Sequence, residues 1–270
     1  MEHPEIVYYN LYLNQLKIIN DSLEQKYNSN NLFDSQVGSF HMFRSIVINL
    51  TFLSKNHESS SFTTFTTLSR MIIDNYATFF LITSNNTKEE QELRYALYFI
   101  DSLKCRIKTT TDFAAALKNI PEHITEINKK ALENDRMAIE KFTTKIYSKE
   151  LNSLVEEKVI ERCNWKFQSI KPAKNGNSYS WEELYHIAKI PKHFSSAIQN
   201  HFSQFTHGLA LSILYNNGNP DSKESILGIL NIVQMLLGKI MLERFGDDLK
   251  DSKIEERFIE ACNYHWDNWK

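Results

Sequence analysis

Apolar residues recur at spacings of three and four along most of this chain, and that period is typical of amphipathic α-helices. Residues 4–28 show the pattern at Ile6, Tyr9, Leu13, Leu16 and Ile19. The same spacing predicts further helical stretches over 34–54, 62–83, 88–118, 121–149, 150–163, 181–189, 191–216, 221–246 and 252–268. The sequence therefore predicts an all-α protein, a multi-helix bundle of about eight to ten helices.

Residues that favour helix starts stand where several of these helices should begin. Asp34, or the serine after it, can act as the N-cap of the second helix, because its side chain can accept a hydrogen bond from a free backbone N–H. Thr87 with Glu90, and Ser180 with Glu183, have the spacing of a capping box. These signals support the predicted helix boundaries independently of the apolar pattern.

We expect a single helical domain over residues 1–270, because neither an internal repeat nor a low-complexity tract divides the chain. A subdivision near 120 is an alternative, since a helix start at Pro121 follows a long helix there. In either case we expect the late helices at 190–246 to pack back on the early helices at 34–83, because both regions are apolar enough to need a shared core.

Glycine and proline are scarce, and this excludes several classes of fold. The chain has 7 Gly and 5 Pro, whereas average usage at this length would give about 19 Gly and about 13 Pro. Tight turns, hairpins and phosphate-binding loops consume these residues. A β-sandwich, a β-barrel, a Rossmann domain and a P-loop domain are therefore disfavoured, and no fingerprint of a nucleotide-binding loop occurs.

Charge and cysteine content favour a cytoplasmic protein that has no membrane partner. The formal net charge is −2, so the chain as a whole does not attract nucleic acid or an anionic membrane surface. Three widely spaced cysteines fit a reducing compartment better than a disulfide framework. The first five residues lack the apolar core of a signal peptide.

The most apolar run of the chain, Ile226 to Leu242, is interrupted by Gly228, Asn231, Gln234, Gly238 and Lys239. We interpret the run as a buried bundle helix, because it is too short and too polar to span a bilayer. Its two glycines would permit close contact with another helix.

Three segments are depleted in charge, although 24% of all residues are charged. Residues 35–54 contain Arg44 alone, residues 62–82 contain Arg70 and Asp74, and residues 193–219 contain neither Asp, Glu, Lys nor Arg. A helix without charges on any side is usually buried all round. We therefore expect these three segments at the centre of the bundle, with the apolar run as a fourth neighbour.

The few polar residues of these central helices form a candidate site. Arg70 and Asp74 lie four residues apart on one helix face and can pair, and Ser203 and His207 have the same spacing on the late helix. The candidate ligand-binding residues are Arg44, Arg70, Asp74, Asn200, Ser203 and His207. Two arginines against one aspartate favour an anion, such as a phosphate or a carboxylate. The alternative is a purely structural network that fixes the register of the helices.

The pairing of an Arg-x-x-x-Asp helix with a later Ser-x-x-x-His-Gly helix resembles a family of bacterial all-helical proteins of uncharacterised function. The matching positions within residues 60–215 are Arg70, Asp74, Arg94, Tyr95, Tyr98, Ser203, His207 and Gly208. Asp74 stands where the family usually has Glu, and His201 stands where an aromatic residue is common. The resemblance implies a bacterial or phage origin and a role in defence against mobile elements, and it implies no known reaction.

A second comparison is with the HEPN helical ribonucleases, in which an Arg precedes a His on one late helix. In that family the Arg orients the scissile phosphate and the His assists proton transfer at the 2′-hydroxyl. Here the residues ahead of His207 include Asn200, His201 and Phe202 and no Arg. A metal-independent ribonuclease acting on RNA would therefore need an arginine from another helix, Arg70 or Arg44. The candidate catalytic pair is His207 with Arg70.

Other chemistries have weaker signals, and we expect neither a metal nor a cofactor. Glu183 and His186 have the Glu-x-x-His spacing of di-iron bundles, but a second copy is missing. Cys262 and His265 lack a matching pair of zinc ligands.

A third class of function is a structural interaction module that contacts a protein partner or a second copy through the C-terminal helices. The aromatic residues Phe258, Tyr264, Trp266 and Trp269 would suit such an interface. A chain end folded onto its own core is the alternative.

Overall fold

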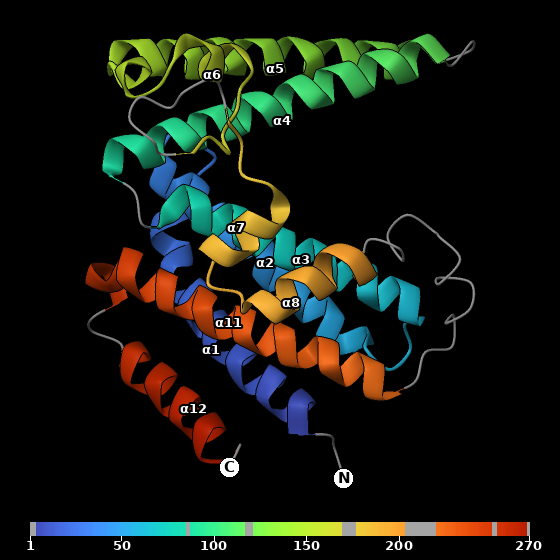
Figure 1. The fold of residues 1–270 in the computed structure, drawn as a ribbon. Coiled ribbons are helices and arrows are strands. Elements are labelled where there is room, and N and C mark those ends of the chain that lie inside the picture. The colour runs from blue at the N-terminus through green and yellow to red at the C-terminus, as the bar shows by residue number, and fades with distance from the viewer. Residues whose placement is uncertain are drawn as a thin grey trace. The chain divides into compact units, whose positions relative to one another are not determined.

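The computed structural model describes residues 4–84, 87–116, 121–168, 177–202, 220–249 and 253–268. The predicted all-α class is confirmed: the described ranges contain ten α-helices, whose arrangement can be followed in Figure 1. They are α1 (Pro4–Tyr27), α2 (Ser35–Asn56), α3 (Phe62–Thr83), α4 (Lys88–Ala116), α5 (Glu122–Ser148), α6 (Glu157–Glu161), α7 (Trp181–Ile187), α8 (Lys192–Ala197), α11 (Pro220–Leu249) and α12 (Ile254–Asn268). The described residues contain a single antiparallel bridge between Phe167 and Ser178 and no longer strand.

Helix capping follows the sequence signals. The Asp34 side chain accepts hydrogen bonds from the backbone N–H groups of the second and third residues after it. Ser180 and Glu183 form a complete capping box at the start of α7. At the start of α4, the Thr87 hydroxyl accepts a hydrogen bond from the Glu90 N–H at 3.2 Å. These side chains satisfy N–H groups that have no partner within the helix.

Two predicted stretches differ from the structure. The amphipathic stretch at 150–163 is a one-turn 3₁₀ helix (Leu151–Leu154) followed by α6. Glu150 and Cys163 bound it with left-handed φ angles of 54° and 51°, and such angles end a right-handed helix. The helix predicted at 191–216 begins as α8 and changes to a π-helical turn at Ile198–Phe202. Residues 203–219 lie outside the described residues.

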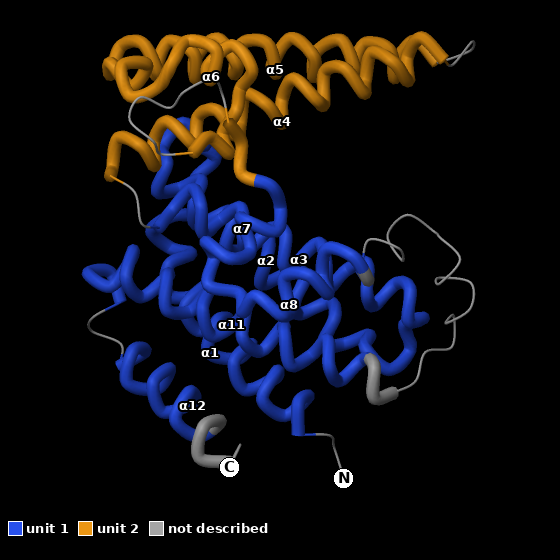
Figure 2. Tube along the Cα trace, in the orientation of Figure 1, with its two compact units in different colours: residues 1–84, 180–270 blue, residues 85–179 orange. Residues whose placement is uncertain are grey.

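The chain forms two compact units, which Figure 2 colours separately. Unit 1 consists of residues 1–84 and 180–270, and unit 2 consists of residues 85–179. In unit 2, α4 and α5 pack along each other, and the 3₁₀ helix Leu151–Leu154 contacts both. Position 120, the possible subdivision, thus falls between two helices of the same unit, and the boundaries lie at 84–85 and 179–180.

Unit 1 is organised around α1, α3 and α11. α11 packs on both α1 and α3, while α2 contacts the same two early helices. α7 packs against α3 and α8 against α7, and α12 contacts α1 and α11. The core is therefore shared between early and late parts of the sequence. Two buried hydrogen bonds link distant segments: the Tyr9 hydroxyl donates to the Leu50 carbonyl, and the Tyr76 hydroxyl donates to the Ala188 carbonyl.

Charge depletion identifies a central helix in one case and a surface helix in another. α3 buries most of its length, including Ile72, Ile73 and Tyr76. The expectation of all-round burial is wrong for α2, where Ile48 is 58% exposed and Phe52 is 53% exposed. Among the described elements, α2 has its main contacts with α1 and α3. The absence of charge on the exposed part of α2 therefore does not reflect burial.

α11 extends beyond both ends of the apolar run from Ile226 to Leu242. The segment Lys223–Leu249 is long and apolar enough to cross a membrane by length and composition, in contrast to the shorter run considered above. Of its most apolar window, 61% is buried inside the protein. A buried core helix meets the same criterion of length and composition.

Candidate functional site

Arg70 and Asp74 lie on α3 where it meets α7. The Arg70 Nε donates to Asp74 Oδ2 at 3.4 Å, and both side chains are mostly buried. The Tyr185 hydroxyl on α7 donates a hydrogen bond to the other oxygen of the Asp74 carboxylate. The ion pair is therefore part of the contact between two helices of unit 1, between apolar surfaces.

Two features of this contact are unusual for a purely structural pair. Arg70 Nη1 is buried and has no hydrogen-bond acceptor among the described residues. Burial also raises the pKa of Asp74 above its ordinary value, although the hydrogen bond from Tyr185 and the charge of Arg70 act to lower that pKa. The desolvation of the carboxylate is the larger effect.

The raised pKa of Asp74 predicts how this residue changes stability with pH. A carboxyl whose pKa is higher in the folded protein binds more protons when folded than when unfolded. Its contribution to the free energy of unfolding is therefore largest below the unfolded value near 3.8, and it falls as the pH rises through the folded pKa. As the pH rises from the unfolded to the folded pKa of Asp74, we expect the free energy of unfolding of the wild type to fall relative to that of Asp74→Asn. Urea unfolding of both proteins at a series of pH values measures it, and a constant difference would contradict the expectation.

The structure places the other predicted site residues apart from this pair. Arg44 on α2 pairs with Glu24 of α1 at 2.8 Å and donates to Asn28 at 3.1 Å, so its charge is already balanced on the α1 side. The Asn200 amide is exposed and donates to the Ser196 hydroxyl at 3.2 Å. Among the described residues no contact joins Arg44 or Asn200 to Arg70.

Ser203, His207 and Gly208 lie outside the described residues. The catalytic pair of His207 and Arg70 therefore stays a prediction, and so does convergence of the six candidate residues on one anion.

The two candidate metal motifs have other surroundings. The Glu183 carboxylate accepts the N–H of Ser180 at 2.6 Å, which gives it a capping role at α7. Burial raises the pKa of the Cys262 thiol to about 11, which disfavours the thiolate that binds metals. Within the described ranges there is no group of three His, Cys, Asp or Glu side chains that could hold a metal ion.

The C-terminal aromatic residues divide between core and surface. Phe258 is buried against α11, and Tyr264 is largely exposed with its ring centroid 6.3 Å from that of Tyr8. The Trp266 side chain and Trp269 lie outside the described part of the chain. A partner or a second copy at these helices stays a prediction.

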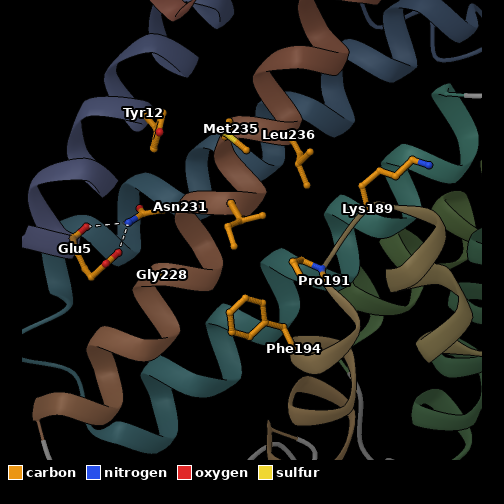
Figure 3. A pocket seen from close by; sticks show the side chains of 10 residues that line it. Glu5, Tyr12, Lys189, Pro191, Phe194, Gly228, Asn231, Met235 and Leu236 are labelled. Atoms are coloured by element: carbon orange, nitrogen blue, oxygen red, sulfur yellow. Dashed lines mark hydrogen bonds between the residues drawn. The ribbon is translucent and has the colours of Figure 1, made fainter. Parts of the chain in front are cut away.

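A cavity that is not predicted from the sequence lies in unit 1 between α1, α8 and α11 (Figure 3). Its volume is about 290 Å³. It is lined by Glu5, Tyr12, Lys189, Pro191, Phe194, Gly228, Asn231, Ile232, Met235 and Leu236. Most of the lining is therefore apolar, and α11 contributes five of these residues, which recur along one face of the helix.

The connection between α7 and α8 forms one wall of the cavity. Lys189 has a left-handed φ of 65°, which is uncommon for a residue with a side chain. The turn continues to Pro191, which precedes α8 as its N-cap, and Phe194 follows on the first turn of that helix. This geometry places the proline and the phenylalanine opposite α11, as Figure 3 shows.

A small polar cluster closes the α1 end of the cavity. The Asn231 Nδ2 donates to the Glu5 carbonyl oxygen at 3.1 Å and to the Glu5 Oε2 at 2.7 Å. The Asn231 side chain is buried, and its Oδ1 accepts no hydrogen bond from the described residues. An unpaired buried acceptor is costly, so its presence needs an explanation.

The sequence contains a weak signal of this cavity. Gly228 and Asn231 count only as interruptions of an apolar run when the sequence is considered alone. They are three residues apart, so they share one helix face. That signal does not identify Glu5 or Phe194 as the facing residues, because they come from segments about 190 residues apart.

Comparison with protein-family models, with curated proteins and with solved structures found no match to this chain. The resemblance to bacterial all-helical proteins therefore stays an expectation, together with the defence role that it implies. The geometry of the described residues, the cavity above all, is the remaining basis for a function.

Proposed function

We propose that unit 1 binds a small apolar molecule in the cavity between α1, α8 and α11. The observation that carries this proposal is an apolar cavity of about 290 Å³ with the hydrogen-bonded pair of Glu5 and Asn231 among its lining residues. Small-molecule sites are concave, mostly apolar and provided with a few polar groups that fix orientation. The cavity has these properties.

The chemistry of the lining fits an apolar occupant. Phe194 and Leu236 offer a rigid ring and a branched side chain, while Met235 is flexible and adapts to an irregular shape. Most of the lining favours an apolar guest over water, because a water molecule against that surface would lack polar partners. A bound molecule would make van der Waals contacts with lining atoms that have no neighbour while the cavity is empty.

A fluorescent probe tests the proposal directly. N-phenyl-1-naphthylamine is neutral and apolar, carries one N–H donor, and fluoresces strongly only in an apolar environment. We expect it to bind the full chain at a single site. Gly228→Leu should weaken binding at least about tenfold, because the new side chain extends into the cavity and costs the probe at least 1.4 kcal/mol of contacts. The nearest atom to a Cβ at this position is the Glu5 Oε2 at 3.6 Å, so a Cβ fits there in ordinary van der Waals contact.

Gly246→Leu is the matched control on the same helix, because no atom lies within 4 Å of a Cβ there and the residue is outside the cavity lining. It should bind the probe like the wild type. Absence of probe binding to the wild type would overturn the proposal, and so would equal weakening by both substitutions.

Anion binding at Arg70 is the second candidate function. It is favoured by the buried Arg70 Nη1, which has no acceptor among the described residues. Asp74 already provides a negative charge beside this guanidinium, which reduces its attraction for an external anion. We therefore rank anion binding at Arg70 after the apolar site. The ribonuclease hypothesis needs the same arginine, so it depends on anion binding there.

A further inference from the structure

We propose that Lys104 and Cys163 of unit 2 form a covalent sulfenamide cross-link when the protein meets a peroxide. The two residues come from different segments, because Lys104 lies on α4 and Cys163 follows the end of α6. The Lys104 Nζ donates a hydrogen bond to the Cys163 Sγ at 3.1 Å. The pair is independent of the cavity, whose lining residues all belong to unit 1.

The backbone around Cys163 holds the thiol in place. The Cys163 N–H donates to the Ile160 carbonyl oxygen at 2.9 Å, and the Cys163 carbonyl oxygen accepts the Trp165 N–H at 2.9 Å. The next residue, Asn164, donates its N–H to the Val159 carbonyl oxygen at 2.9 Å. Cys163 is therefore part of a closed turn at the end of α6, and its sulfur keeps a defined position opposite α4.

The Lys104 side chain gives the buried thiol its route to the solvent. Cys163 is 3% exposed, whereas Lys104 is exposed, and the hydrogen bond between them is partly buried. Exposed side chains change rotamer within picoseconds to nanoseconds. Movement of Lys104 therefore opens the sulfur to a molecule as small as hydrogen peroxide, and its return brings the amine back beside the oxidised sulfur.

The reaction has two balanced steps and uses hydrogen peroxide as its oxidant. In the first step one peroxide oxygen is transferred to the sulfur, so the thiol becomes a sulfenic acid and the peroxide is reduced to water. In the second step the Lys104 amine, after its ammonium proton has passed to the solvent, attacks the sulfur with its lone pair. The S–N bond forms, the S–O bond breaks, and the hydroxyl group leaves as water with one amine proton. The product has two hydrogen atoms fewer than the reduced pair.

The other two cysteines have different surroundings. Cys105 is exposed and Cys262 is half-buried, and among the described residues neither thiol forms a hydrogen bond with a lysine. Burial also raises the pKa of the Cys262 thiol to about 11, which disfavours the thiolate that reacts with peroxide. A sulfenic acid at Cys105 would meet a second thiol or more peroxide rather than an amine. Cys163 is therefore the cysteine at which we expect the cross-link.

Peptide mass spectrometry of the full chain after treatment with hydrogen peroxide tests the proposal. The experiment uses the Cys105→Ser background, because a disulfide from Cys105 would join the same two segments with the same change of mass. We expect the segment with Lys104 to be linked to the segment with Cys163, with two hydrogen atoms lost and no tryptic cleavage after Lys104. Dithiothreitol should release both segments. Oxidation of Cys163 to sulfinic acid without a linked product would overturn the proposal, and so would a link that retains an oxygen atom.

Lys104→Arg is the matched variant in the same background. A guanidinium keeps the positive charge and the N–H donors but stays protonated, so it has no lone pair for the attack on sulfur. We expect the linked product to be lost and Cys163 to be recovered as sulfenic or sulfinic acid. Lys108→Arg, one turn further along α4 and also exposed, is the control and should keep the link. An undiminished link in Lys104→Arg, or equal loss in both variants, would overturn the assignment to Lys104.

Discussion

Replacement of Arg94 by Met is expected to lower the free energy that keeps unit 2 folded by about 3–5 kcal/mol, the usual cost of removing one partner of a buried ion pair. The Arg94 side chain is fully buried and forms an ion pair with Glu90 at 2.7 Å. It also donates to the carbonyl oxygens of Trp165 and Phe167, both at 2.8 Å, and lies over the Phe167 ring at 3.8 Å. Methionine would fill part of the space and leave one carboxylate and two carbonyls without this donor.

Hydrogen exchange followed by mass spectrometry measures this effect within unit 2, because it reports the opening free energy of individual helices in the full chain. Peptides from α4 should exchange much faster in Arg94→Met. The control is Lys149→Met, which removes a 51% exposed lysine from its pair with Glu92. Exposed pairs of this kind contribute less than about 1 kcal/mol. Similar exchange in the two variants would show that Arg94 is not the main link between α4 and the segment at 165–167.

Gly238→Ala is expected to destabilise the contact between α11 and α12 by about 1–3 kcal/mol, the typical cost of overpacking a core. A Cβ at this position would overlap Cε2 and Cζ of the Phe258 ring, far inside van der Waals contact. The ring is buried, so it cannot move aside without exposing apolar surface or shifting α12. Thermal unfolding, together with exchange in α12 peptides, measures the loss.

Gly246→Ala gives the opposite expectation on the same helix. No atom lies within 4 Å of a Cβ there, and alanine is favoured over glycine inside a helix by about 0.5–1 kcal/mol. The free energy of unfolding of Gly246→Ala should therefore rise or stay constant, whereas that of Gly238→Ala should fall. The double variant Gly238→Ala with Phe258→Leu should recover part of the loss, because the smaller side chain leaves room. A fall in stability of the same size at both glycines would contradict the close contact at Gly238.

The helices could be predicted from the sequence because their signals are local. Apolar spacing and caps such as Asp34 and Ser180 depend on a few neighbouring residues, and most predicted boundaries lie within two residues of those observed. The short helices at 151–161 escaped prediction because left-handed backbone at Glu150 and Cys163 is not required by either residue type.

The candidate site could be predicted only in part. The pairing of Arg70 with Asp74 follows from their i,i+4 spacing on one helix, whereas their contact with Tyr185 depends on the docking of α7, which is 111 residues away from Asp74. Arg44 shows the limit of reasoning from charge depletion. It is the only charge on its segment, but Glu24 on another helix neutralises it. The cavity could not be predicted for the same reason, since its lining residues come from segments far apart in the sequence.

The two-part composition of unit 1 has a consequence for the order of folding during synthesis. Unit 2 is one uninterrupted run of residues and can complete its contacts soon after residue 179 has been made. α1 and α3 can contact α2 early, but they must wait for α11, a major partner of both, until the whole of unit 2 has been synthesised. The apolar faces of α1 and α3 are therefore exposed on the nascent chain during this interval. This delay makes the early helices, rather than the late ones, the segments that most need protection from aggregation before the chain is released.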